Sequence, residues 1–98
     1  MGIPCFLWAR ANGIEAWIKP LANGGYAVCF LNRGAGATKL DFNWQQTATD
    51  PDLNKTYSID GSYTVSDIWN NVDLGTTQKN ILTTIKGHDV LFVTLKKK

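Results

Sequence analysis

Hydrophobic and polar residues in the first third of the chain follow the two-residue period of β-strands. In the segment 14–20, apolar residues alternate with charged residues and a tryptophan. The apolar positions are Ile14, Ala16 and Ile18, and the positions between them are Glu15, Trp17 and Lys19. This alternation predicts a strand with one buried face. A second strand-like run follows over 26–33. The residues between the two runs, Asn23-Gly24-Gly25, tolerate the positive φ angles of a tight hairpin turn. We therefore predict a β-hairpin over residues 14–33.

The second strand of this hairpin is apolar on both of its faces. Its two sets of side chains are Tyr26, Val28, Phe30 and Ala27, Cys29, Leu31. An antiparallel strand with one face in water should be polar at every second position. We therefore expect a second protein surface to cover this strand. The candidates for a carbohydrate-binding or domain-interface surface are Trp17, Tyr26, Val28 and Phe30.

Two further tryptophans are expected in the core. The segment 37–45 alternates, and Trp44 shares its apolar face with Leu40 and Phe42. Trp69 ends a strand-like segment, 63–69, whose large apolar side chains share one face. Trp44 and Trp69 are therefore structural core candidates.

The remaining chain predicts short strands separated by turns, and no segment of ten residues shows helical periodicity. Strands are expected over 72–76, 80–86 and 90–96, and the last two are expected to form a hairpin across Gly87-His88-Asp89. The polar segment 46–62 is typical of a long loop. Residues 1–13 show no clear pattern and are expected to form a lead-in segment. Residues 14–98 thus predict an all-β, antiparallel sandwich of seven to eight strands with Greek-key-like connections.

Composition and charge argue against nucleic-acid and membrane partners. The net charge is +2, but three positive charges belong to Lys96, Lys97 and Lys98, and no basic stripe interleaved with aromatic residues is present. No apolar run approaches the roughly 20 residues that span a bilayer. We expect no nucleic-acid partner and no membrane partner.

Catalytic and metal-binding groups are sparse. The one histidine, His88, lies in a predicted turn, and the one glutamate, Glu15, lies at strand spacing from Lys19, where an ion pair is expected. Zinc needs three or four ligands, and the spacing Asp50-x-Asp52-x-Asn54 lacks the later ligands of a calcium loop. We expect no metal, no cofactor and no catalytic residue. Cys5 and Cys29 fit either free thiols or a single disulfide.

Three stretches carry a family resemblance. The segment EAWIKPLANGGYAVCFLNRG at 15–34 resembles the hairpin vWaKPLadGs-AVal-FNRG that opens the C-terminal β-sandwich of family 27 glycoside hydrolases, the α-galactosidases or melibiases and their α-N-acetylgalactosaminidase relatives. YTVSDIWNNVDLG at 63–75 is similar to Y-VrDLW-g-DLG of the same domain, and KGHDVLFVTLK at 86–96 is similar to its last strand. Ser66 stands where the family often has arginine.

The resemblance implies a non-catalytic domain that packs on and stabilises a TIM-barrel catalytic domain. It places the catalytic aspartates in that barrel, so no catalytic residue is assigned to this chain. We expect an excised domain or a natural fragment, whose uncovered strand favours a weak homodimer through the 14–33 hairpin. The compartment of the parent enzyme stays open, and a secreted, a periplasmic and a lysosomal enzyme all fit the resemblance. A carbohydrate-binding accessory module and an immunoglobulin-like interaction domain are the alternative functions.

Overall fold

The computed structural model describes residues 5–11, 13–21, 24–51, 54–59, 62–68 and 72–97. Within these ranges the chain forms ten strands and no helix, so no helix that could cross a membrane is found there. The strands are β1 (Phe6–Ala11), β2 (Ile14–Pro20), β3 (Tyr26–Asn32), β4 (Thr38–Phe42), β5 (Thr47–Asp50), β6 (Lys55–Ser58), β7 (Tyr63–Asp67), β8 (Val72–Thr76), β9 (Ile81–Ile85) and β10 (Val90–Lys97). All of the strand pairs among them are antiparallel, which confirms the predicted all-β class.

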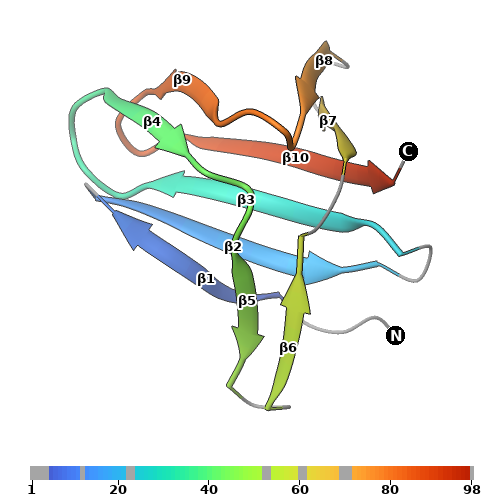
Figure 1. Ribbon diagram of the computed structural model, residues 1–98. Helices are drawn as coiled ribbons and strands as arrows, with labels where there is room; N and C mark the ends of the chain where they lie inside the picture. The colour runs from blue at the N-terminus through green and yellow to red at the C-terminus, as the bar shows by residue number, and fades with distance from the viewer. Residues whose placement is uncertain are drawn as a thin grey trace.

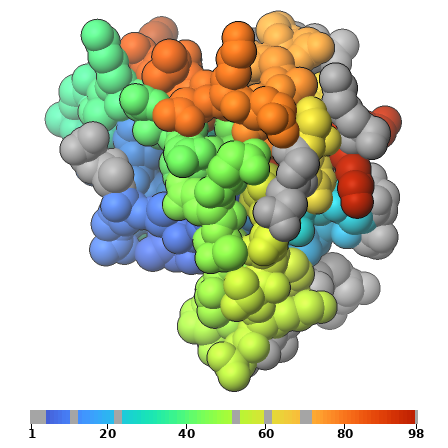
Figure 2. All heavy atoms as spheres, viewed as in Figure 1, coloured from blue at the N-terminus to red at the C-terminus, as the bar shows by residue number. Residues whose placement is uncertain are grey.

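Two layers make up the fold (Figure 1). The first is a six-stranded sheet in the order β1-β2-β3-β10-β7-β8, and the second consists of the pairs β4-β9 and β5-β6. The chain crosses between the layers several times, and the last strand, β10, is inserted between β3 and β7. This insertion is the Greek-key-like feature that joins distant parts of the sequence. The hairpin β5–β6 extends beyond the rest of the molecule (Figure 2).

The core lies between the two layers. The six-stranded sheet contributes the alternate side chains of its central strands, and the smaller pairs contribute Leu40, Phe42, Ile81 and Ile85. Aromatic rings fill the centre, where Trp44 is only 1% exposed and its ring centroid lies 5.4 Å from that of Phe42. Trp44 thus occupies the position expected from the pattern of 37–45. Trp69 lies outside the described residues.

The predicted hairpin over 14–33 is present. Strands β2 and β3 pair from Ile14↔Asn32 to Pro20↔Tyr26, and Gly24 in the turn has φ +86°. Ile14, Ala16 and Ile18 are buried, as their alternation predicted.

Residues 6–11 form a strand where the sequence pattern indicated an unpatterned lead-in. The register of β1 on β2 shifts between Leu7 and Ala9, so Trp8 and Ala9 both pack against the core. This bulge breaks the two-residue period on which the strand prediction relied. Phe6 is buried in consequence at 6% exposure.

The segment 46–62 was wrongly predicted to be a long loop. It contains the hairpin β5–β6, which pairs from Thr47↔Ser58 to Asp50↔Lys55. Ala48 and Asp50 of β5 point into the protein, whereas the residues between them are exposed. A strand whose inward positions are small or acidic carries little hydrophobic signal, so composition alone indicated a loop.

The predicted hairpin between the last two strands is also wrong. Both strands exist, but β9 pairs with β4 in the second layer and β10 pairs with β3 and β7 in the first. The connection 86–89 therefore crosses between the layers. At this crossing a Cβ on residue 87 would overlap the backbone of Ala35. Glycine is therefore the residue that fits at position 87.

Candidate functional site

The outer face of the six-stranded sheet carries a continuous apolar row. Strand register places Leu7 opposite Trp17, Trp17 opposite Cys29, and Cys29 opposite Phe92. The next row pairs Leu31 with Val90. We call these residues the outer apolar face: Leu7, Trp17, Cys29, Leu31, Val90 and Phe92. All six are half-buried.

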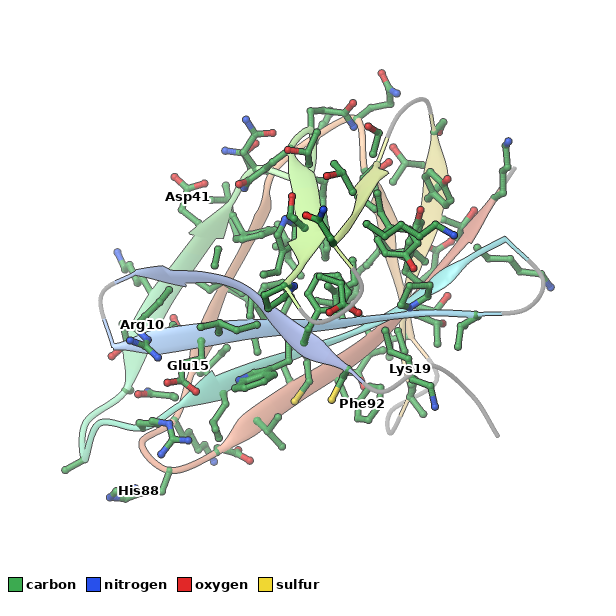
Figure 3. The ribbon with its side chains drawn as sticks, turned by 90° about the horizontal axis from the view of Figure 1, so that it is seen from below. Arg10, Glu15, Lys19, Asp41, His88 and Phe92 are labelled. Atoms are coloured by element: carbon green, nitrogen blue, oxygen red, sulfur yellow. The ribbon has the colours of Figure 1, made fainter. Side chains whose placement is uncertain are left out.

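Both β-pairs of the second layer lie on the opposite side of the sheet. Figure 3 shows Phe92 and Lys19 on one side of it and Asp41 of β4 on the other. Among the described residues, the core contacts of the second layer are made with the inward set of β3, namely Val28 and Phe30. Among the described strands, those of the second layer therefore pack on the inner face of the sheet and not on the outer apolar face.

The candidate surface residues have to be corrected in this light. Tyr26, Val28 and Phe30 are between 0% and 8% exposed inside the sandwich, so they line the core and not a surface. Trp17 is on the outer face as expected. The residues of β3 that accompany it are the smaller set Ala27, Cys29 and Leu31.

Sequence reasoning missed Leu7, Val90 and Phe92 as members of this face. The sequence did indicate that the two residues of β10 lie on an apolar outer face. Residues 90–93 are a run of four apolar residues, so neither face of this strand segment is polar. Leu7 could not be placed, since the bulge in β1 hides which of its side chains point outward.

A charged cluster borders the outer apolar face. The Glu15 carboxylate contacts Arg33 Nε at 3.0 Å and Arg10 Nη2 at 3.2 Å, and Trp17 Nε1 donates a hydrogen bond to it at 3.1 Å. Glu15 is buried behind these groups, whereas the two arginine side chains are 63% and 66% exposed. The partner predicted for Glu15 was Lys19, but two arginines from β1 and the end of β3 take that role.

This cluster makes stability depend on pH in acid. The hydrogen bonds from Arg33 and then Trp17 outweigh partial desolvation and hold the pKa of Glu15 below its ordinary value of 4.5. A carboxylate with a lowered pKa contributes stability above its ordinary pKa and loses that contribution as the pH falls through the lowered value. We expect Glu15→Gln to lower the melting temperature at about pH 7 and to have a smaller effect as the pH falls towards about 2, because protonation of the carboxylate progressively removes its contribution. Thermal unfolding across this range tests it, with Asp41→Asn on β4 as the control. An equal effect of Glu15→Gln at both pH values would contradict it.

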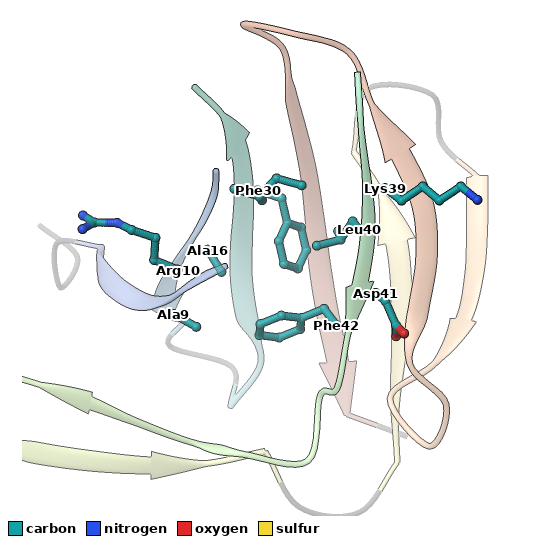
Figure 4. A pocket seen from close by; sticks show the side chains of 9 residues that line it. Ala9, Arg10, Ala16, Phe30, Lys39, Leu40, Asp41 and Phe42 are labelled. Atoms are coloured by element: carbon teal, nitrogen blue, oxygen red, sulfur yellow. The ribbon is translucent and has the colours of Figure 1, made fainter. Parts of the chain in front are cut away.

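A small cavity opens between β1 and β4, at the side of the sandwich (Figure 4). It has a volume of about 40 Å³ and is lined by Ala9, Arg10, Ile14, Ala16, Phe30, Lys39, Leu40, Asp41 and Phe42. Ligand pockets typically enclose about 300–1,000 Å³. This cavity therefore has room for water and not for a sugar ring.

The other candidate groups do not form a site. Cys5 and Cys29 are free thiols, and burial raises the pKa of Cys29. His88 lies in the connection between β9 and β10 with φ +57°, as its turn position predicted. No group of three or more His, Cys, Asp or Glu side chains suited to a metal occurs among the described residues.

Comparisons with known proteins agree with this architecture. The sequence pattern of the family described as "Alpha galactosidase C-terminal beta sandwich domain" matches residues 11–95. Alpha-galactosidase A of Cellvibrio japonicus is 30% identical over 97 residues, which are 97% of this chain and 24% of that protein. This chain thus spans about a quarter of the curated relative.

Solved structures share the fold at low sequence identity. A GH27 β-L-arabinopyranosidase from Geobacillus stearothermophilus is similar with a TM-score of 0.75 and 19% identity, over 98% of this chain and 20% of that one. Alpha-galactosidase I from Mortierella vinacea gives a TM-score of 0.70 and 21% identity, over 94% of this chain and 23% of that one.

The three quoted motifs, the sandwich and the match over 11–95 lead to one assignment. The chain belongs to the family of C-terminal β-sandwich domains of α-galactosidase-like glycoside hydrolases.

Proposed function

We propose that this domain has a packing role without catalysis of its own, and that it stabilises the catalytic domain of an α-galactosidase-like enzyme by covering it with the outer apolar face. The observation that carries the proposal is the half-buried apolar row formed by Leu7, Trp17, Cys29 and Phe92, on the face of the sheet opposite to the described second layer. The family assignment and the length of the curated relative support a catalytic domain as the partner, because about three quarters of that protein lies outside the matching domain.

The energetics favour burial of this face. Burying one large apolar side chain contributes roughly 1.5–3 kcal/mol, and the half-buried residues here have part of that contribution still to gain. Contiguous apolar patches on soluble proteins commonly mark interaction sites. Trp17 and Phe92 are the largest side chains of the face, so they are the principal contacts in the proposed interface.

The charged cluster supports a fixed geometry for Trp17. Its indole N–H donates to Glu15, which two arginines hold in place. The polar edge of the indole is thus occupied within the chain, and its apolar surface is what remains for a partner. This arrangement holds the apolar ring face of Trp17 in one orientation, as packing against another protein layer requires.

A chimeric enzyme tests the proposal. The chain replaces the matching segment of the Cellvibrio japonicus enzyme, and the double variant Trp17→Gln, Phe92→Gln is compared with Val72→Gln, which changes an exposed apolar residue of β8 at the edge of the six-stranded sheet. We expect the double variant to lower the melting temperature of the chimera at least twice as much as that of the isolated chain, because contacts across the interface are lost only in the chimera. Val72→Gln should change the melting temperatures of the chimera and of the isolated chain equally.

Activity gives the second readout. We expect the isolated chain to show no hydrolysis of an aryl α-galactoside above background. The chimera should hydrolyse the same substrate. Equal destabilisation of chimera and isolated chain by the double variant would contradict docking through this face. Hydrolysis by the isolated chain that is lost on changing one of its aspartates would contradict the packing role.

A further inference from the structure

Strand β9 has one unpaired backbone edge among the described residues. It pairs with β4 from Thr38↔Ile85 to Phe42↔Ile81, and no described strand pairs with its other edge. Only its first and last residues are buried, and the three between them are exposed. Leu82, in this exposed stretch, is 73% exposed, the largest value among the exposed large hydrophobic residues of the described chain. Such an edge is a template for the addition of another strand.

The edges of the six-stranded sheet are protected, whereas that of β9 is not. β1 has a bulge between Leu7 and Ala9, and β8 has a register shift against β7 together with Gly75 at φ +98°. Bulges and charges on edge strands prevent pairing with other chains. The segment 80–85 pairs with β4 without a register shift and contains no charged residue.

A groove follows the free edge of β9. Two adjoining hollows of about 300 and 340 Å³ share Asp67, Thr83 and Leu91 in their linings. Leu74 of β8 and Leu82 of β9 line the second hollow. Figure 2 shows β9 at the surface of the molecule next to β8. The groove therefore lies along the edge of β9 to which a further strand would add.

We propose that β9 pairs with β9 of a second copy of this chain, antiparallel and with the two-fold axis at Thr83. The pairing joins two β4-β9 pairs into one four-stranded sheet, and each copy contributes the same surface, as a two-fold dimer requires. Hydrogen bonds between the two β9 backbones hold the dimer, and the apolar side chains beside them shield these bonds from water.

The sequence of β9 is complementary to itself in this register. Ile81 lies opposite Ile85 of the second copy, Leu82 opposite Thr84, and Thr83 opposite Thr83, so inward residues pair with inward residues. Opposed threonines form a favourable cross-strand pair. Lys86 of one copy lies opposite Asn80 of the other, so no like charges are opposed. These features select a second copy of this chain as the occupant of the edge.

Charge reversal at the two-fold axis provides the test. Thr83→Lys and Thr83→Glu each place like charges directly opposite each other in a homodimer, while an equimolar mixture of the two variants places opposite charges there. Thr83 is exposed in the monomer, so neither change should prevent folding. Thr56→Lys on β6, also an exposed strand threonine, is the matched control. Sedimentation equilibrium at concentrations up to about 1 mM measures the association.

We expect the native chain and Thr56→Lys to dimerise with the same Kd, and each Thr83 variant to raise that Kd about tenfold or more. The mixture of Thr83→Lys and Thr83→Glu should restore it. Amide hydrogen exchange in β9 should also slow with rising concentration of the native chain.

Two results would overturn the proposal. One is a native chain that stays monomeric up to about 1 mM. The other is a dimer that survives both Thr83 variants and is lost with Trp17→Gln, which would assign self-association to the outer apolar face and the 14–33 hairpin. Failure of the chimera experiment would leave the result for β9 unaffected, because the two surfaces are on different layers.

Discussion

Replacing Trp44 with alanine is expected to lower the free energy of unfolding by roughly 3–5 kcal/mol, the usual cost of truncating a buried tryptophan. Trp44 is 1% exposed and stands at the centre of an aromatic cluster in which its ring centroid lies 5.7 Å from that of Phe30 and 6.2 Å from that of Trp8. Its removal leaves a cavity between the two layers that backbone adjustment can fill only in part. A whole domain has about 5–15 kcal/mol of stability, so the variant should be close to unfolding at 37 °C.

Thermal and urea unfolding of the isolated chain measure this effect. We expect the melting temperature to fall by at least about 12 °C, given about 4–8 °C per kcal/mol for a domain of this size. Trp44→Phe keeps an aromatic ring in the core and should cost less than half as much. Trp17→Ala is the matched control on the outer face, where Trp17 is only half-buried. A loss from Trp17→Ala as large as that from Trp44→Ala would contradict this account of the core.

Replacing Asn32 with alanine is expected to cost roughly 2–4 kcal/mol, although only a polar side chain is lost. Asn32 is fully buried at 0% exposure, and its amide nitrogen donates to the carbonyl oxygens of Gly36 at 3.0 Å and Ile85 at 2.9 Å. Its amide oxygen accepts a hydrogen bond of 2.9 Å from the Gly34 N–H. One side chain thus links the end of β3, the following loop and the end of β9. Its removal would leave the Ile85 carbonyl without this partner in the protein interior and would release the loop at Gly34 and Gly36 from both strands.

The comparison with Asn43→Ala separates this role from a general effect of asparagine. Asn43 is exposed, and its side chain accepts a local hydrogen bond from Gln45 N. We expect Asn43→Ala to change the free energy of unfolding by no more than about 0.5 kcal/mol in urea titrations. Hydrogen exchange of Asn32→Ala should show earlier opening of β9 than of β2. Equal stability of the two variants would show that the buried amide does not connect the layers.

Local patterns determined several of the strands and the family. Alternation over 14–20 and 37–45 placed β2 and β4 with the correct faces inward, because side chains of a strand alternate between core and solvent. The lack of alternation in 26–31 showed that both faces of β3 carry apolar side chains, and among the described residues the second layer packs on one of them. That feature, together with the motifs at 15–34 and 63–75, was sufficient to identify the sandwich and its family before its topology was known.

Pairing between distant strands was decided only by the tertiary structure. β9 and β10 are adjacent in sequence, yet they lie in different layers, because Ile81 and Ile85 pack onto the core from β4's side while β10 fits between β3 and β7. The role of Glu15 likewise depends on Arg10 and Arg33, which register brings beside it from two other strands. A two-residue period reports which side chains share a face of one strand. It contains no information about which strand lies next to it or which layer it joins, and the outer apolar face and the free edge of β9 both arise from those choices.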